Sequence, residues 1–344
     1  MTTASVAFSK KETAEMDASV AVIGAGYWGK NLLRNFHDLG ALAAVCDADP
    51  EVVGRFKASY PGIAGFDDVD EVLQDAAIEA VAIATPAATH ADLARRALER
   101  GKHVFVEKPL ALDEEGAAAV CRLAAERHLT LMVGHLLLYH PAFIALKAAV
   151  DEGKIGNLLY VHSTRASFGK FRQEENALWS FAPHDISMML ALVGRTPARV
   201  TCNGAAWLNP KVADTTLSHL DFGGGVQGHI FVSWLHPYKD HRLVVIGESG
   251  MLVFNDTLPG AEKLLLYPHS VNWNGDLPVP NKAEMRPLPY AEDEEPLRGE
   301  CRHFLDCVAS GEPPRSDGSE GLRVLKVLGA CQSALVSGAP VDLG

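Results

Sequence analysis

The sequence lacks the features typical of secreted, membrane-spanning and metal-binding proteins. Its six cysteines are scattered and none belongs to a C-x-x-C pair, so they predict neither a disulfide framework nor a metal site. No apolar stretch reaches the length of a transmembrane helix. These absences together predict a cytoplasmic protein with free thiols, no bound metal and no membrane attachment.

Positive charge is also scarce in this chain. Asp and Glu number 43 against 31 Lys and Arg, which gives a formal net charge of −12. Such an acidic balance argues against nucleic acid and against anionic membrane surfaces as main partners. A phosphorylated ligand stays compatible with it, because such a ligand needs only a few local cations.

A glycine-rich stretch near the start of the chain is its most informative feature. The apolar run 20–23 leads into Gly24, Gly26 and Gly29, and an amphipathic helical pattern follows up to Gly40. In a strand–turn–helix unit the first glycine permits the turn, the second lets a diphosphate approach the backbone, and the third lets the helix pack on the strand. This context predicts a dinucleotide site rather than an ordinary glycine-rich turn.

An acidic residue follows the next predicted strand. The apolar run 42–46 ends at Asp47, and Ala, Asp and Pro come directly after it without an arginine. A carboxylate there can hold the ribose hydroxyls of NAD and repels the additional phosphate of NADP. The sequence therefore predicts NAD as the cofactor.

Strands and helices alternate with short links as far as residue 133, which predicts a doubly wound parallel sheet. Ligands bind at the carboxyl ends of such strands. The polar groups expected at those ends are Thr85 with His90 nearby, Glu107-Lys108, and His135.

Lys108 lies between an apolar strand and Pro109, which restricts the lysine backbone and can adopt a cis peptide bond. A lysine at this place can donate to a substrate hydroxyl or stabilise an alkoxide. The alternative role is a surface salt bridge with Glu107. Spacing alone does not decide between the two roles.

After residue 138 the pattern changes to strands of alternating character, with hairpin signals at 223–225 and 248–250. We expect an α+β unit with a large, mostly antiparallel sheet, a helix over 183–193, an extended surface segment over 256–296, and closing helices over about 297–310 and 319–336. The alternating apolar residues Val226, Ile230 and Val232 predict a sheet face that needs cover, hence a dimer or tetramer.

The second chemical cluster leads directly into the helix expected at 183. His184 titrates near neutrality and can accept a hydroxyl proton while hydride leaves the same carbon. The alternative is a histidine that packs near a helix end. Close to it in sequence, the candidates for substrate contact are Arg165, Arg172, Asn176 and Trp179.

These residues resemble the Gfo/Idh/MocA oxidoreductases. The resemblance rests on the glycine fingerprint, on Ala-Thr-Pro at 84–86 with His90, on Glu-Lys-Pro at 107–109, and on His184, and it covers nearly all of the chain after residue 18. It implies catalytic roles for Lys108, beside the nicotinamide, and for His184. Many members carry an aspartate four residues before that histidine, where this chain has Ser180. The cofactor contacts it implies are Gly24, Gly26, Tyr27, Trp28, Gly29, Asp47, Thr85, Pro86, His90, Glu107 and Lys108.

The same resemblance implies the division of the chain. We expect a mobile extension over 1–17, a dinucleotide-binding Rossmann domain over 18–138, and a substrate-binding and oligomerisation domain over 139–344. In the family the open face of the second sheet makes the subunit contact, and the last helix returns to the nucleotide domain.

Segments 134–143, 178–187, 233–242 and 295–308 resemble the branch that oxidises nucleotide sugars at C3. This branch implies NAD-dependent oxidation of a UDP-linked N-acetylhexosamine, with the 3-keto product passed to an aminotransferase for cell-surface glycans or lipid A. The open alternatives are the corresponding uronic acid as substrate, a 3-ketoreductase working in the opposite direction, and a non-catalytic NAD-dependent sensor.

Overall fold

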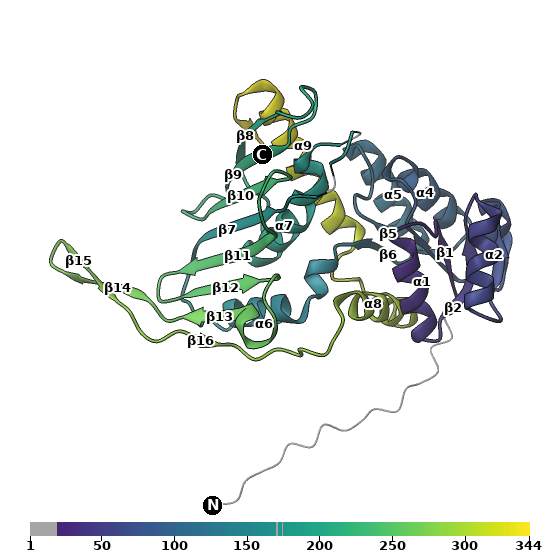
Figure 1. Ribbon diagram of the computed structural model, residues 1–344, viewed down its shortest axis with the longest axis horizontal. Coiled ribbons are helices and arrows are strands. Elements are labelled where there is room, and N and C mark those ends of the chain that lie inside the picture. The colour runs from purple at the N-terminus through teal and green to yellow at the C-terminus, as the bar shows by residue number, and fades with distance from the viewer. Residues whose placement is uncertain (1–18, 170, 174) are drawn as a thin grey trace, which may run out of the picture.

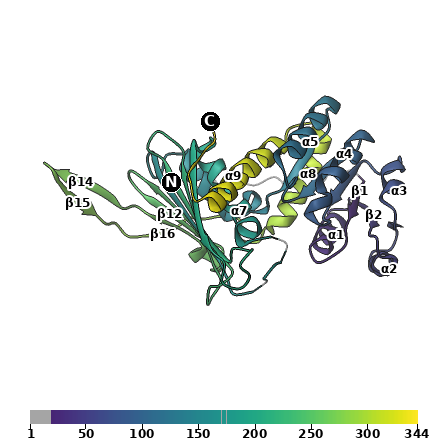
Figure 2. The ribbon, with the colours of Figure 1, turned by 90° about the horizontal axis from the view of Figure 1, so that it is seen from above.

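The computed structural model describes residues 19–169, 171–173 and 175–344, so the extension expected at 1–17 lies outside the described residues. Two large sheets lie side by side, and the long helices α7 and α9 lie between them (Figures 1 and 2). Helix α9 contacts helix α5 on the side of the first sheet and strand β8 of the second. This arrangement places the first sheet's loops opposite the start of α7.

The first sheet has six parallel strands in the order β3-β2-β1-β4-β5-β6. That order confirms the doubly wound α/β fold. Its strands are β1 Val20–Ile23, β2 Leu42–Cys46, β3 Ala64–Phe66, β4 Ala80–Ile83, β5 His103–Glu107 and β6 Leu131–Gly134. Its helices are α1 Gly29–Asp38, α2 Pro50–Ser59, α3 Val69–Gln74, α4 His90–Glu99 and α5 Glu114–Arg127, with the 3₁₀ turns η1 Ala87–Thr89 and η2 Leu136–Tyr139.

Burial explains why these strands form. All four residues of β1 and of β4 are buried, as parallel strands covered on both faces require. Helix α1 places Leu32, Leu33 and Phe36 at 0 % exposure against the sheet, and its charged residues lie on the opposite side. The periodicity of the sequence is therefore sufficient to specify this half of the fold.

The second sheet has nine strands in the order β16-β13-β12-β11-β7-β10-β9-β8-β17. Only the β7–β10 pair is parallel, so the expected mostly antiparallel sheet is confirmed. Its strands are β7 Leu158–Ala166, β8 Arg199–Ala205, β9 Thr215–Asp221, β10 Gln227–Ser233, β11 Asp240–Gly247, β12 Met251–Asn255, β13 Leu264–Tyr267, β16 Arg286–Pro287 and β17 Val341–Asp342. The helices of this half are α6 Pro141–Asp151, α7 Ala177–Val193, α8 Pro296–Ser310 and α9 Gly318–Ser337.

Helix α7 begins six residues earlier than expected, at Ala177 rather than at 183. The Asn176 side chain accepts a hydrogen bond from the Trp179 backbone N–H at 3.1 Å and caps the helix. Pro183 thus lies inside the helix, where it removes a single backbone donor. The expectation placed Pro183 in the first turn because prolines are common at helix starts. It was wrong because the helix begins after its actual cap, Asn176.

The segment 256–296 is not only extended surface chain. Its 3₁₀ turn η3 Gly260–Lys263 leads into β13, which pairs with β12 and places Leu264 and Leu266 in the buried core, and β16 pairs with β13. Strands β14 Ser270–Asn274 and β15 Leu277–Asn281 form a separate hairpin that projects away from the body (Figures 1 and 2). We call this hairpin the arm.

The sheet face inferred from Ile230 and Val232 was assigned wrongly. Both side chains are buried, at 1 % and 0 % exposure, on the side of the sheet that helix α7 covers. The other face of β10 carries His229 and Phe231, which are half-buried. Alternation shows which residues share a face but not which face the helices cover.

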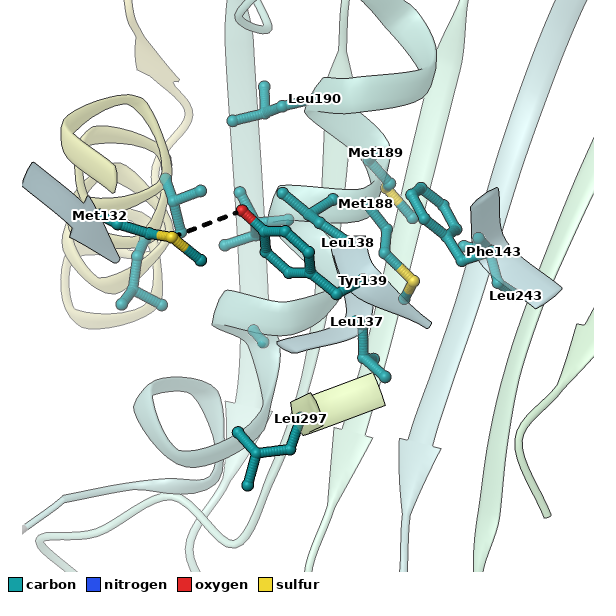
Figure 3. Close-up of a cluster of buried hydrophobic side chains, with 14 of the residues drawn as sticks. Met132, Leu137, Leu138, Tyr139, Phe143, Met188, Met189, Leu190, Leu243 and Leu297 are labelled. Carbon is teal, nitrogen blue, oxygen red and sulfur yellow. Dashed lines mark hydrogen bonds between the residues drawn. The ribbon is translucent and has the colours of Figure 1, made fainter. Parts of the chain in front are cut away.

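The core between the two sheets is centred on turn η2. Figure 3 shows Leu137, Leu138 and Tyr139 surrounded by side chains of β6, α6, α7, β11 and α8. The Tyr139 hydroxyl also bonds to the Ser316 hydroxyl at 2.9 Å, just before α9. One short turn therefore joins the two halves of the chain and keeps their relative position.

Candidate active site

The glycine loop has the geometry that a dinucleotide needs. Gly24 has a φ of +88°, and a Cβ there would lie 2.9 Å from the backbone of Ala84 and Thr85. A Cβ on Gly29 would lie 1.8 Å from the Gly24 carbonyl oxygen. At Gly26 a Cβ would meet nothing within 4 Å, so the space beside this residue is open to a ligand. The loop therefore fits a diphosphate held against its backbone.

Asp47 lies directly beside this loop. Its carboxylate accepts a hydrogen bond from the Ala25 backbone N–H at 2.7 Å and another from the Asp49 N–H at 3.1 Å. These two bonds fix the carboxylate at the end of β2, where the ribose of a dinucleotide would lie. The geometry fits an NAD site.

Trp28 and Glu107 connect the glycine loop with the end of β5. The Trp28 indole N–H donates to the Glu107 carboxylate. Burial raises the pKa of Glu107 to about 7, although the indole bond and the Lys108 charge oppose this shift. Tyr27, which is 72 % exposed, lines the same cavity as both residues.

His90 connects two loops of the first sheet. Its ring nitrogens lie 2.8 Å from the Pro109 carbonyl oxygen and 2.8 Å from the Thr85 carbonyl oxygen. Burial lowers the pKa of this histidine, and the side chain is 2 % exposed. The neutral ring has one N–H and donates it to one of these two carbonyl oxygens, so His90 links the loops that carry Thr85 and Pro109 beside the cavity.

Lys108 enters the cavity from the end of β5, and its peptide bond to Pro109 is cis. Its Nζ donates to the Ser180 carbonyl oxygen of helix α7 at 3.2 Å. Burial lowers the pKa of the ammonium below its ordinary 10.5, and Arg172 and Arg165 add to this effect, while Glu175 and Glu107 oppose it. Among the described residues no salt bridge joins Lys108 to Glu107, so the surface role weighed against function finds no support.

His184 reaches the same cavity from helix α7. Burial, followed by the charges of Lys108 and Arg165, lowers its pKa well below 6.5, so the ring is neutral near neutral pH. Its Nδ1 is buried and has no hydrogen-bond partner in the part of the chain that the structure describes. His184 lines the cavity, so its neutral imidazole can accept a proton from a bound hydroxyl through a ring nitrogen that faces the ligand.

Arg165 belongs to a buried ion pair that holds it at the cavity wall. Its Nε and Nη2 donate to the Asp185 carboxylate at 2.8 and 3.2 Å, and its Nη1 lies 3.2 Å from His241 Nδ1. Ser163 also donates to Asp185. A two-point contact of this kind fixes the plane of the guanidinium. Sequence reasoning assigned a role to neither Asp185 nor His241, although both lie in segments that resemble the nucleotide-sugar branch, 178–187 and 233–242, and Asp185 directly follows His184.

The structure separates the other candidates for substrate contact. Arg172 lines the cavity and pairs with Glu175 at 2.8 Å. Asn176 and Trp179 do not line it. Their side chains donate to the Gln332 side-chain oxygen of α9 at 2.8 and 3.1 Å.

One cavity of about 450 Å³ lies at the junction of the two sheets. Its wall from the first sheet carries seven of the cofactor candidates, namely Tyr27, Trp28, Thr85, Pro86, His90, Glu107 and Lys108, whereas Gly24, Gly26, Gly29 and Asp47 do not line it. The wall from α7, β7 and β11 carries His184, Arg165 and His241. Within the described ranges, no group of His, Cys, Asp or Glu is arranged to hold a metal ion. None of the described helices combines the length and the apolar character needed to cross a bilayer.

Known proteins share this arrangement over most of the chain. Residues 18–135 match an oxidoreductase family with an NAD-binding Rossmann fold, and residues 143–253 match the C-terminal domain of the same family. The chain belongs to the Gfo/Idh/MocA oxidoreductase family. Its cofactor is accordingly NAD.

Two curated relatives cover nearly the whole chain. The scyllo-inositol 2-dehydrogenase (NAD(+)) of Bacillus subtilis is 29% identical over 96% of this chain and 97% of that enzyme. The UDP-N-acetylglucosamine 3-dehydrogenase of Acidithiobacillus ferrooxidans is also 29% identical, over 88% of this chain and 93% of that enzyme. A solved structure of the latter enzyme matches with a TM-score of 0.81 at 25% identity, over 93% of this chain and 97% of that chain. Both relatives are oxidoreductases. Because this chain is equally identical to an inositol dehydrogenase and to a nucleotide-sugar dehydrogenase, sequence identity does not distinguish the two classes of substrate.

Proposed function

We propose that this oxidoreductase oxidises the C3 hydroxyl of a UDP-linked N-acetylhexosamine, with UDP-N-acetylglucosamine as the preferred substrate. The main support for a catalytic role is that Lys108 and His184 line the same cavity, which the glycine loop also borders through Tyr27 and Trp28. A non-catalytic sensor has no need for such a pair. Two observations support the choice of substrate. Four segments of the sequence resemble the nucleotide-sugar branch of the family, and the chain is similar to a UDP-N-acetylglucosamine 3-dehydrogenase.

The chemistry requires a hydride and a proton to leave the same alcohol. Bound NAD supplies the hydride acceptor. Lys108 donates to the substrate oxygen and stabilises the alkoxide character that develops as the C–H bond breaks. His184 is neutral because burial lowers its pKa, so it can receive the hydroxyl proton as the C=O bond forms. Arg165, fixed by Asp185, contributes a positive charge to the same wall.

Because Ser180 stands where an aspartate is usual, either His184 or Lys108 can be the base, and experiment must decide between them. The usual aspartate partner of the histidine is missing, and the Ser180 carbonyl oxygen instead accepts from Lys108. If Lys108 loses its proton beside the cationic nicotinamide, it is the base and His184 positions the sugar.

A substrate panel tests the proposal most directly. Purified protein with NAD is mixed with UDP-N-acetylglucosamine, its C6 uronic acid, UDP-N-acetylgalactosamine, scyllo-inositol or myo-inositol, and NADH absorbance is followed. We expect turnover with UDP-N-acetylglucosamine and none with the inositols, and Lys108→Met is the inactive control. Faster oxidation of an inositol than of any UDP sugar would refute the nucleotide-sugar assignment. Faster oxidation of the uronic acid than of UDP-N-acetylglucosamine would make the uronic acid the substrate.

We further propose that the protein works in the cytoplasm as a dimer or tetramer and passes a 3-keto product to an aminotransferase. All six cysteines are unpaired, which fits a reducing compartment. Assembly is supported by the second sheet, whose uncovered face carries the half-buried side chains Val244, Ile246 and Val253, and by the apolar arm.

A further inference from the structure

A second cavity adjoins the candidate active site. It has a volume of about 230 Å³ and is lined by Phe171, Arg172, Gln173, Leu208, Asn209, Val212, Asp214 and Trp234. Arg172 lines both cavities, so a ligand passing this arginine can occupy the two spaces together. The first cavity must hold the nicotinamide and the reacting sugar ring, which leaves the second for another part of the substrate.

Trp234 lines this second cavity and carries a buried donor without a partner in the described part of the chain. The side chain is 2 % exposed, and its indole N–H has no hydrogen-bond partner among the described residues. Buried indole N–H groups in folded proteins are usually bonded, because an unpaired buried donor is costly. Because the N–H is itself covered in this structure, a ligand carbonyl can supply the missing acceptor once the cavity wall moves slightly to admit it.

The wall around Trp234 is held in place from two sides. The Trp234 backbone N–H donates to the Asp214 carbonyl oxygen at 2.9 Å, and the Asp214 carboxylate accepts from the Trp207 and Leu208 backbone N–H groups. Asp214 itself is 2 % exposed. Asp214 thus fixes the loop after β8 through its carboxylate and connects it to the end of β10 through its backbone carbonyl.

The remaining walls suit an aromatic ring followed by a phosphate. Phe171 is 45 % exposed and offers a ring face on which a planar base can stack. Arg172 pairs with Glu175 through one nitrogen, so its other donors can reach an anion between the two cavities. A nucleoside diphosphate whose outer phosphate carries the reacting sugar presents these groups in this order.

We propose that this second cavity binds the nucleoside of the substrate, with Trp234 donating to a carbonyl of a pyrimidine base, Phe171 stacking on that base and Arg172 contacting the diphosphate. The proposal rests on the nucleotide-sugar function proposed above. The proposal makes the substrate long enough to span both cavities and gives it a pyrimidine base. Lys108 and His184 contact only the reacting sugar, so they cannot select these features.

The test measures binding of UDP and of uridine to the NAD-loaded protein by calorimetry, with UDP-N-acetylglucosamine turnover followed in parallel. Trp234→Phe removes the donor and keeps a ring, so UDP and uridine should each bind roughly tenfold more weakly, and the KM for UDP-N-acetylglucosamine should rise by more than kcat falls. Arg172→Gln should weaken UDP and leave uridine unaffected. Trp207→Phe is the matched control, because Trp207 is 67 % exposed and does not line the cavity.

The outcomes separate this subsite from the reaction. Turnover of UDP-N-acetylglucosamine with equal UDP affinity in wild type, Trp234→Phe and Phe171→Ala would overturn the subsite and leave the function standing. UDP binding that Trp234→Phe weakens, without turnover of any UDP sugar, would uphold the subsite and refute the reaction. Absence of both UDP binding and turnover would overturn both. A thermal melt of each variant shows that it is folded, and Phe171→Tyr should keep wild-type affinity.

Discussion

At the scale of single residues, Asp47 should decide which dinucleotide binds. Its carboxylate is fixed beside the glycine loop by the Ala25 N–H, so an additional phosphate on the ribose meets a negative charge. We expect tighter binding of NAD than of NADP and a smaller difference in Asp47→Ser, measured as dissociation constants of both cofactors. Asp49→Ser, two residues away, is the matched control and should keep the preference. Equal or tighter NADP binding by the wild type would contradict the assignment.

Lys108 and His184 should carry the chemical step. Loss of one positioned proton-transfer or oxyanion group typically costs about a hundredfold to ten-thousandfold in rate. Lys108→Met should lose turnover to this extent with little change in NAD affinity, because the glycine loop holds the cofactor separately. His184→Asn keeps a hydrogen bond but removes basicity, so it should also lose most turnover if the histidine is the base.

Single-turnover kinetics of both variants check this expectation. A substantially active His184→Asn beside an inactive Lys108→Met would assign the base to Lys108. Near-normal rates in both variants would refute the site.

The pH dependence of kcat/KM should identify the base independently. Burial lowers both pKa values, from 6.5 for His184 and from 10.5 for Lys108. Each group accepts a proton only in its deprotonated form, so activity should rise with pH through the pKa of the base. If His184 is the base, activity should fall again as Lys108 loses its proton, because the charged lysine stabilises the developing alkoxide. If Lys108 is the base, activity should stay level above the pKa of the lysine. A rise that is complete below about pH 6.5 indicates His184. A rise between pH 6.5 and 10.5 that disappears in Lys108→Met would instead indicate the lysine.

At the scale of elements, the start of helix α7 is anchored to helix α9. Gln332 accepts from the side chains of Asn176 and Trp179, and Asn176 also caps α7. Asn176→Ala should therefore lower the free energy of unfolding by about 1–2 kcal/mol, because a helix cap and a side-chain bond are lost. Urea unfolding measures this change.

The Michaelis constant for the sugar should change little in Asn176→Ala, because this side chain does not line the cavity. Ser333→Ala, next to Gln332 and exposed, is the control for stability. A large rise in KM with unchanged stability would restore Asn176 as a substrate contact.

At the scale of the whole molecule, the arm and the uncovered sheet face should hold copies of the chain together. A two-stranded hairpin alone is marginally stable in water, and the arm exposes Trp273 at 69 %, Leu277 at 64 % and Val271 at 54 %. We expect a dimer or tetramer by light scattering at micromolar concentration. Trp273→Glu should shift it toward smaller species, whereas Val336→Glu on the distant helix α9, also exposed, should not. A monomeric wild type would refute the prediction.

The sequence by itself determined the nucleotide-binding half and its cofactor. The glycine positions follow from local backbone requirements, the buried strands follow from continuous apolar runs, and Asp47 follows from its place after the second strand. Each of these signals acts over a few neighbouring residues, so one chain suffices to read it. Lys108 and His184 could each be proposed as a catalytic residue from the sequence for the same reason, because each lies in a short recognisable segment.

Only the tertiary structure decided how distant residues combine. It brought Lys108 and His184 to one cavity, turned Asn176 and Trp179 toward Gln332, and covered Ile230 with helix α7. A periodic pattern defines a face of a helix or strand but not its neighbour, because packing is settled by contacts between segments far apart in the chain. For the same reason the pairing of the buried Asp185 with Arg165, and the unpaired indole of Trp234, could not be predicted from the sequence.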